Sequence, residues 1–292
     1  MTDTAPEFLT VRELADLLRV KERKVYDLAS SGQLPVSRAT GKLLFPEAEV
    51  RAWIDGNRSG PTDQIARPNV LLGSHDPLLE WAIRQSQSGI ASLLDGSADG
   101  LARFNAGEGV AAGMHIRDTA TGGWNIDAVQ AAMGDQNAVL VSWATRRRGL
   151  VARAEDAARF RTIDDLAGRK VVARQKESGA EVLLAHLLTE AGLAASDIAF
   201  TDPVRSEQDG ILAVVEGQAD ATFGLEALAR PYGLSFQPLV DERFDILIDR
   251  RAYFESPMQK LLAFCSSDDF ADKAKLLGGY DVENLGQVLW NP

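Results

Sequence analysis

The stretch GILAVVEGQADATFGLEALARPYGLSFQPLVDERFDILI, residues 210–248, decides the fold of most of this chain. It completes a series of alternating strand-like and helix-like segments that begins at Pro68. Alternating β and α units predict an α/β fold with a parallel, open sheet that carries helices on both faces. Ligand sites of such sheets lie at the carboxyl ends of the strands, where helix N-termini point their N–H groups.

The earlier members of the series follow the same plan. NVLLGSHDPLLEWAIRQ (69–85) is a strand, a small polar turn and an amphipathic helix, and GIASLLDGSADGLARFNAGEG (89–109) repeats it. AVLVSWATRRRGLVAR (138–153) is a long apolar segment that we expect to include a crossover between two lobes. TIDDLAGRKVVARQKESGAEVLLAHLLTEAG (162–192) predicts a short helix, a strand, a turn and a helix.

The first sixty residues have a different pattern, which predicts two short helices joined by a tight turn. In FLTVRELADLLRVKERKVYDLASSGQLPV (8–36), apolar residues recur at helical spacing. Thr10 and Glu13 form a capping box at the start of the first helix, and Gly32 is a stop signal for the second. This arrangement is typical of a helix-turn-helix domain.

A wing and a third helix follow these two helices. LPVSRATGKLLF (34–45) places two short apolar arms around a turn, which predicts a β-hairpin wing. The segment from Pro46 onward predicts the third helix, and the polar residues 59–67 predict a linker. We therefore expect a winged helix-turn-helix domain at 1–58 and a second domain at 68–292.

Composition is that of a globular protein, and the charge is unevenly distributed. The 292 residues are 45% apolar and 25% charged, with a net charge of −11. The first sixty residues carry nine basic and nine acidic side chains, so the remainder holds the acidic excess. We expect the basic face of the first domain to turn outward for DNA binding, which favours a homodimer or higher homo-oligomer.

The location predicted from the sequence is cytoplasmic. There is no apolar window long enough for a membrane span and no basic-then-apolar leader at the N-terminus. A single cysteine, Cys265, excludes an internal disulfide and suits a reducing compartment.

The N-terminal segment resembles the excisionase/MerR-type helix-turn-helix family. The resemblance rests on LTVRELADLLRVKERKVYDLASSGQLP, the arm from Gly41 to Phe45 and the EVRAWI helix. It implies that the second helix enters the major groove of double-stranded DNA while the wing touches the backbone or minor groove. The implied DNA-binding residues, which are otherwise solvated side chains of a small domain, are Arg23, Lys24, Tyr26, Arg38 and Lys42.

Residues 68–265 resemble the type II periplasmic-binding-protein superfamily, more closely its cytoplasmic branch, which includes molybdate-binding relatives. Four pieces carry the resemblance: GSHDPLLEWA, DGSADGLARFNAGEGVAAGMH, GRKVVARQKESGAEVLLAHLLTEAG and the stretch 210–248. The resemblance implies a two-lobed fold with a ligand cleft, here in a sensor rather than a transport component.

Serines in three equivalent turns are the first candidates for ligand contacts. Ser74, Ser97 and Ser178 each follow a predicted strand at the start of a helix, where a hydroxyl and free N–H groups form an anion site. In the molybdate-binding relatives, hydroxyls and amides of these turns surround the oxyanion. The alternative for each serine is an ordinary N-cap.

Four further residues complete the predicted ligand-binding set. His75 and His115 lie at strand ends, where a histidine donates to an oxyanion or serves only a structural role. Arg147, within the cluster Arg146-Arg147-Arg148, faces either the cleft or solvent. Asp209 stands where the relatives carry a Thr/His pair, and it favours a ligand with a donor group in addition to an anionic group.

The sequence thus predicts a one-component transcription regulator that senses a small anionic ligand. The leading ligand class is a molybdate- or tungstate-type oxyanion, followed by a small organic acid or sulfonate. We expect no metal site, no cofactor, no membrane partner and no enzymatic activity, because there is no ligand cluster and no catalytic constellation. The alternatives are a constitutive DNA-binding architectural protein with a dimerising second domain, and an enzyme on the two-lobed fold.

Overall fold

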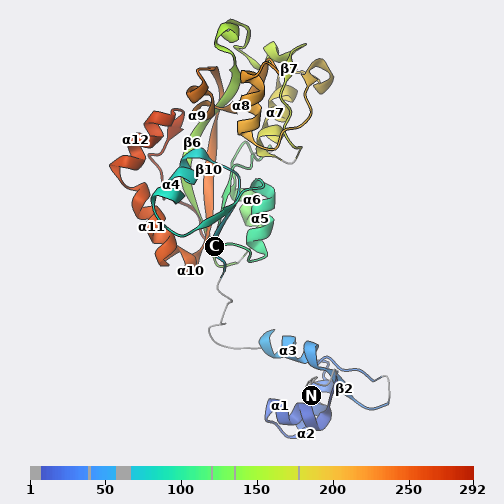
Figure 1. Cartoon of the computed structure of the whole chain (residues 1–292). Coiled ribbons are helices and arrows are strands. Elements are labelled where there is room, and N and C mark those ends of the chain that lie inside the picture. The colour runs from blue at the N-terminus through green and yellow to red at the C-terminus, as the bar shows by residue number, and fades with distance from the viewer. Residues whose placement is uncertain (1–7, 39–40, 57–66, 120, 135, 177) are drawn as a thin grey trace, which may run out of the picture. The chain divides into compact units, whose positions relative to one another are not determined.

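The computed structural model describes residues 8–38, 41–56, 67–119, 121–134, 136–176 and 178–292 (Figure 1). The chain divides into two compact units, residues 1–66 and 67–292. The predicted linker, 59–67, lies outside the described residues except for Arg67. The Arg67 guanidinium lies 4.4 Å from the centre of the Phe104 ring and 3.3 Å from the Asp249 carboxylate, so this residue packs on the second unit.

The first unit is a helix-turn-helix domain with a small sheet. Strand β1 pairs antiparallel with β2, a pairing that the sequence pattern does not reveal. The predicted capping box is confirmed, because Glu13 N donates to Thr10 Oγ1 (3.3 Å) and Thr10 N donates to Glu13 Oε2 (2.8 Å). The elements are β1 (Phe8–Thr10), α1 (Val11–Leu18), α2 (Glu22–Ser30), β2 (Leu44–Pro46) and α3 (Glu47–Gly56).

The core of this unit forms as the apolar spacing predicts. Leu14 of α1, Val25 of α2, Phe45 of β2 and Val50 of α3 are fully buried against one another. In the predicted wing, Ser37 forms an antiparallel bridge with Leu44, while residues 39 and 40 of its turn lie outside the described residues.

The second unit is a two-lobed α/β domain built on one sheet with the strand order β4-β3-β5-β10-β6-β9-β7-β8, with β11 and β12 also paired to β6. The strands are β3 (Val70–Gly73), β4 (Ala91–Leu93), β5 (Ala111–Met114), β6 (Ala138–Ala152), β7 (Lys170–Val171), β8 (Ala199–Phe200), β9 (Ala221–Leu225), β10 (Ser235–Asp249), β11 (Tyr280–Asp281) and β12 (Val288–Trp290). The α-helices are α4 (Pro77–Gln85), α5 (Ser97–Asn105), α6 (Ile126–Met133), α7 (Gly179–Glu190), α8 (Glu207–Val215), α9 (Glu226–Ala229), α10 (Arg250–Tyr253), α11 (Ser256–Cys265) and α12 (Asp268–Leu277).

The sequence predicted a parallel sheet, but the observed sheet contains both parallel and antiparallel pairs. The predicted crossover between the lobes is confirmed as β6. The chain later crosses back as β10, a second 15-residue strand that runs antiparallel to β6 through both lobes. The apolar run FDILI at the end of β10 gives a clear strand signal in the sequence. The first half of β10 mixes polar with apolar residues and contains Pro238, so its strand signal is weaker.

Helices cover both faces of the sheet in the first lobe, as predicted. Figure 1 shows α4, α11 and α12 on one face and α5 and α6 on the other. Each group buries its own apolar cluster against the shared strands. In the second lobe, α7 packs on the short strands β7 and β9. Among the described residues, no helix combines the length and apolar character needed to cross a membrane.

Three glycines bring α5 unusually close to the end of β3. A Cβ on Gly100 would lie 2.2 Å from Gly73 Cα, and a Cβ on Gly73 would lie 2.1 Å from Gly113 O. Gly73 has φ +101°, which L side chains rarely adopt. Because the backbones touch here, the residues that follow Gly73 and precede Gly100 lie side by side.

We expect Gly100→Ala to destabilise the second unit by about 1–3 kcal/mol, because the added methyl group overpacks rigid backbone. Urea unfolding measures the loss. The matched control is Gly224→Ala in β9, whose Cβ would meet nothing nearer than 3.6 Å. Equal stability of the Gly100 and Gly224 variants would contradict this account of the β3–α5 contact.

Candidate functional site

A polar cleft of about 240 Å³ lies within the second unit, where strand ends and helix starts of both lobes meet. This volume is below the range of about 300–1,000 Å³ typical of pockets for drug-sized molecules, so the cleft suits a smaller ligand. Its lining residues are Ser74, His75, Leu94, Asp95, Gly96, His115, Arg174, Gln175, Ser178, Gly179, Ala180, Arg205, Ser206 and Glu207.

The first-lobe wall contains a directed chain of hydrogen bonds. His115 N donates to Ser97 Oγ (3.0 Å), and Ser97 Oγ lies 2.7 Å from Ser74 Oγ. If Ser97 donates its proton to Ser74, the Ser74 hydroxyl retains its own proton for a group in the cleft. Ser97 itself is buried and does not line the cleft. Its place in the structure is therefore behind Ser74, as a support for the lining residue.

The second-lobe wall begins at the start of α7. Ser178 is the N-cap of this helix, with its Oγ accepting from Glu181 N (3.2 Å), and it also lines the cleft. The N–H groups of Gly179 and Ala180 belong to the first turn, where a helix supplies no internal acceptor. They suit a negatively charged or acceptor-rich group.

The two lobes touch at Gly179. A Cβ on this residue would lie 2.7 Å from His115 Cε1 and 3.1 Å from His115 O. The imidazole of His115 in the first lobe therefore occupies the space that any larger residue at position 179 would need.

Two charged side chains of the second lobe line the cleft with unused hydrogen-bonding capacity. Arg174 donates from Nη2 to Arg205 O (3.0 Å), whereas its Nε and Nη1 are buried and have no hydrogen-bond partner in the described part of the chain. Glu207, the first residue of α8, accepts from Arg148 Nη2 through Oε1 (2.7 Å), whereas its buried Oε2 has no partner there. The cleft lining thus includes an arginine and a carboxylate that each have polar atoms without a hydrogen-bond partner.

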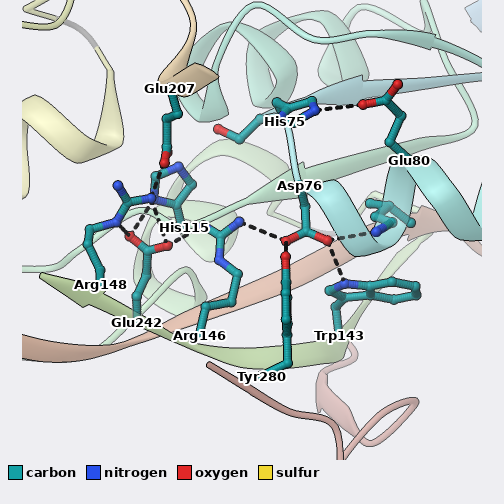
Figure 2. Close-up of polar contacts among 12 residues, drawn as sticks. His75, Asp76, Glu80, His115, Trp143, Arg146, Arg148, Glu207, Glu242 and Tyr280 are labelled. Atoms are coloured by element: carbon teal, nitrogen blue, oxygen red, sulfur yellow. Dashed lines mark hydrogen bonds and ion pairs between the residues drawn. The ribbon is translucent and has the colours of Figure 1, made fainter. Parts of the chain in front are cut away.

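A buried ionic network connects the cleft with the crossing strands (Figure 2). Glu242 of β10 is fully buried and lies opposite Arg146 in the β6–β10 register. Its carboxylate accepts from Arg146 Nη2, from Arg148 Nε (2.6 Å) and from His115 Nδ1 (3.0 Å). Because an ionised carboxylate only accepts, Nδ1 of His115 carries the proton.

The same network reaches α4 through Asp76, the N-cap of that helix. Asp76 Oδ2 accepts from Arg146 Nη1 (3.0 Å) and from the Tyr280 hydroxyl (2.7 Å). Its Oδ1 accepts from Leu79 N (2.7 Å) and from Trp143 Nε1 (3.2 Å). Figure 2 shows Arg146 between the Asp76 and Glu242 carboxylates, so that two buried acids pair with two buried arginines. Arg146 Nε and Arg148 Nη1 have no hydrogen-bond partner in the described part of the chain.

The electrostatics of the network keep Glu242 and Glu207 ionised. Burial alone would raise the pKa of Glu242, but Arg146, Arg148 and His115 hold that pKa well below its ordinary value. Burial likewise acts to raise the pKa of Glu207, and the nearby Arg148 and Arg146 outweigh it, so that this pKa is lowered as well.

Besides Ser97, two predicted ligand residues do not line the cleft. Arg147, for which the sequence left either the cleft or solvent open, turns outward. Side chains alternate along a strand, so the neighbours of Arg147 point inward while Arg147 is half exposed and pairs with Glu226 (2.8 Å). Asp209 was also placed in the site, but it is exposed and closes a capping box with Ser206 at the start of α8. His75 does line the cleft, with its Nε2 bonded to Glu80 (2.6 Å).

The most informative lining residues were not among those predicted. Arg174 follows β7 and Glu207 is the first residue of α8, so both occupy the strand-end and helix-start positions where such folds bind ligands. A charged residue at a helix start is also common on a solvated surface, so the sequence alone gives it a weaker signal than a hydroxyl in a turn. The partners of Glu242 depend on strand register, which no local pattern displays.

The predicted DNA-binding side chains are on the surface of the first unit. Val25 and Ala29 turn one face of α2 into the core, while Arg23, Lys24 and Tyr26 are exposed on the rest of the helix. Arg38 and Lys42, the two predicted residues of the wing, are exposed as well. These positions leave all five side chains accessible to a duplex.

Among the described residues, no group of three or more His, Cys, Asp or Glu side chains has the geometry to hold a metal ion. The acids of the buried network are paired with arginines. The chemistry that the cleft offers is therefore hydrogen bonding and charge pairing.

We expect Glu242→Gln to lower the free energy of unfolding by about 3–5 kcal/mol at neutral pH, because it leaves buried arginines short of a counter-charge. The folded pKa of Glu242 lies below its ordinary 4.5, so its contribution is complete above that pH and is lost as the pH falls toward the folded pKa. The difference in free energy of unfolding between wild type and variant, measured by urea unfolding, should become smaller at acid pH. Glu226→Gln, which breaks a partly exposed pair with Arg147, is the control; a loss as large as that of Glu242→Gln would contradict the expectation.

Comparison with known proteins identifies both units. Residues 8–58 match the family described as "Helix-turn-helix domain". The uncharacterized protein YvgK of Bacillus subtilis (strain 168) is 26% identical over 300 residues, which cover 96% of this chain and 97% of that protein.

Solved structures are similar in fold. A C206 mutant of OxyR from Corynebacterium glutamicum has a TM-score of 0.50 at 10% identity, over 92% of this chain and 89% of its own. The alkanesulfonate-binding protein SsuA from Xanthomonas axonopodis pv. citri, bound to MOPS, has a TM-score of 0.45 at 18% identity, over 75% of this chain and 79% of its own. The family described as "PBP superfamily domain" matches residues 80–266, which is more than half of the chain. The protein is therefore a member of the PBP superfamily domain family with a helix-turn-helix domain at its N-terminal side.

Proposed function

We propose that this protein is a one-component transcription regulator, a DNA-binding protein whose second domain senses a small ligand. The single observation that carries the proposal is the polar cleft with unsatisfied Arg174 and Glu207 in a chain that also has a helix-turn-helix domain. Buried polar atoms without a hydrogen-bond partner cost free energy, which a bound ligand recovers. The cleft acts as a binding site and not as a catalytic one, and the protein works in the cytoplasm.

The ligand of this sensor is small and acidic. The Ser74 hydroxyl, the first turn of α7 after Ser178 and the Arg174 guanidinium belong to residues that line the cleft, and all of them can donate hydrogen bonds. Such donors suit a molybdate- or tungstate-type oxyanion, a small organic acid or a sulfonate.

Ligand binding acts on DNA affinity by favouring the closed arrangement of the two lobes. A ligand shifts an equilibrium only if it binds one state better than the other. Contacts from Ser74 in one lobe and Arg174 in the other are complete only when the lobes approach, which meets this condition. In a homodimer, closure changes the presentation of the two DNA-binding domains.

DNA binding is expected to depend on α2. Arg23→Ala and Lys24→Ala should each weaken binding to a labelled 30-base-pair duplex (a length of about three helical turns) and lower the slope of log affinity against log salt by about one. Fluorescence anisotropy over a salt series measures both quantities. Arg51→Ala on α3, whose guanidinium is bonded to Glu47 (2.6 Å), is the control and should bind as wild type does. Unchanged salt slopes for both α2 variants would argue against this interface.

Ligand binding is expected to depend on the Ser74–Ser97 pair. A ligand at 100 times its Kd stabilises the wild type by about 2.7 kcal/mol, and Ser74→Ala combined with Ser97→Ala should abolish this gain while leaving duplex binding intact. Thermal unfolding with molybdate, tungstate, sulfonates and small organic acids tests it, with Ser92→Ala on the exposed strand β4 as control. A compound that stabilises the protein should also change its duplex affinity. Identical affinity with and without that compound would favour a constitutive DNA-binding protein instead.

A further inference from the structure

The Glu207 carboxylate restricts the chemistry of the ligand more than the hydroxyl groups do. It lines the cleft at the start of α8, with Oε1 held by Arg148 (2.7 Å) and Oε2 buried without a hydrogen-bond partner in the described part of the chain. Nearby arginines lower the pKa of Glu207 despite its burial, so the group is negatively charged at neutral pH. A buried, charged acceptor with a free oxygen requires a donor.

Arg174 supplies the opposite requirement in the same cleft. Its Nε and Nη1 are unpartnered donors, and the first-turn N–H groups of α7 lie on the same wall. These groups need an acceptor, and a negatively charged acceptor serves best. The two unmet requirements therefore differ in sign and belong to different side chains of one small cavity.

A bare oxyanion meets only one of these requirements. Its oxygens accept from Arg174, Ser74 and the start of α7, but they offer nothing to Glu207 Oε2 and repel its charge. A ligand that also carries an ammonium or N–H group satisfies both the donors near Arg174 and the acceptor Glu207 Oε2, to which that group donates. Discrimination by such a group is strong, since its absence leaves a buried polar atom unpaired.

We propose that the ligand is a small zwitterion-like molecule, with a carboxylate, sulfonate or phosphonate group near Arg174 and an ammonium or N–H group at Glu207. Glu207 is then the residue that determines specificity. This inference rests on the proposed ligand-sensing function, and it names the ligand class of the same cleft.

Matched pairs of compounds that differ only in an ammonium group test the inference on the full chain. The pairs are taurine and ethanesulfonate, β-alanine and propionate, and 2-aminoethylphosphonate and ethylphosphonate, with molybdate as the bare oxyanion. Calorimetric titration should give at least one amino compound a Kd about tenfold or more below that of its partner, equivalent to about 1.4 kcal/mol.

Variants of Glu207 assign the preference to this residue. Glu207→Gln should remove most of the preference for the amino compound while leaving the affinity for its partner similar or higher. Glu207→Asp, which keeps the charge that pairs with Arg148, should fold and retain a reduced preference. Glu226→Gln is the matched control, a carboxylate paired with an arginine outside the cleft, and should behave as wild type does.

The outcomes separate this inference from the proposed function. Tighter binding of molybdate or of the compounds without nitrogen, an unchanged preference in Glu207→Gln, or no binding by any amino compound overturns the zwitterion inference. If molybdate or ethanesulfonate binds in a Ser74-dependent manner and alters duplex affinity, the regulator stands without it. If an amino compound binds through Glu207 and leaves duplex affinity unchanged, the ligand class stands and the regulator proposal fails.

Discussion

The placement of one buried carboxylate, Glu242, is the constraint on which the second domain depends. It lies where the strands β6 and β10 pass from one lobe to the other, and it is bonded by Arg146, Arg148 and His115. Each of these cations or donors would be costly to bury alone. Pairing them with one carboxylate makes a charged core tolerable at the point where the lobes must stay connected yet remain distinct.

The contacts of Glu242 also position residues that line the cleft. Because Glu242 fixes the His115 ring, it also fixes the surface against which Gly179 and the start of α7 rest. Because Arg148 bridges Glu242 and Glu207, the cleft-lining carboxylate of Glu207 is part of the same network. Arg148 therefore links any group bound at Glu207 to β6 and β10, the strands that join the lobes.

Local patterns in the sequence were sufficient for most of the elements and for part of the site. The Thr10–Glu13 capping box, the crossover strand, the place of Ser74 directly after β3 and that of Ser178 at the start of α7 all follow from residues close together in the chain. Features that depend on strand register, or on which face of a strand a residue occupies, could not be predicted from local sequence patterns. The pairing of Glu242 with Arg146 is set across β10 and β6, and the outward turn of Arg147 is known only once its neighbours are seen to be buried.

The contact between Gly179 and His115 limits the size of a molecule that fits between the closed lobes. With no side chain at position 179, the lobes reach their shortest separation only when nothing protrudes between the imidazole and the first turn of α7. A compound with the right charges but one substituent too many would occupy the cleft and hold this gap open. Under the proposed sensor function, such a compound would compete with the ligand without allowing the lobes to close, so enlarging the ligand would turn it into an antagonist.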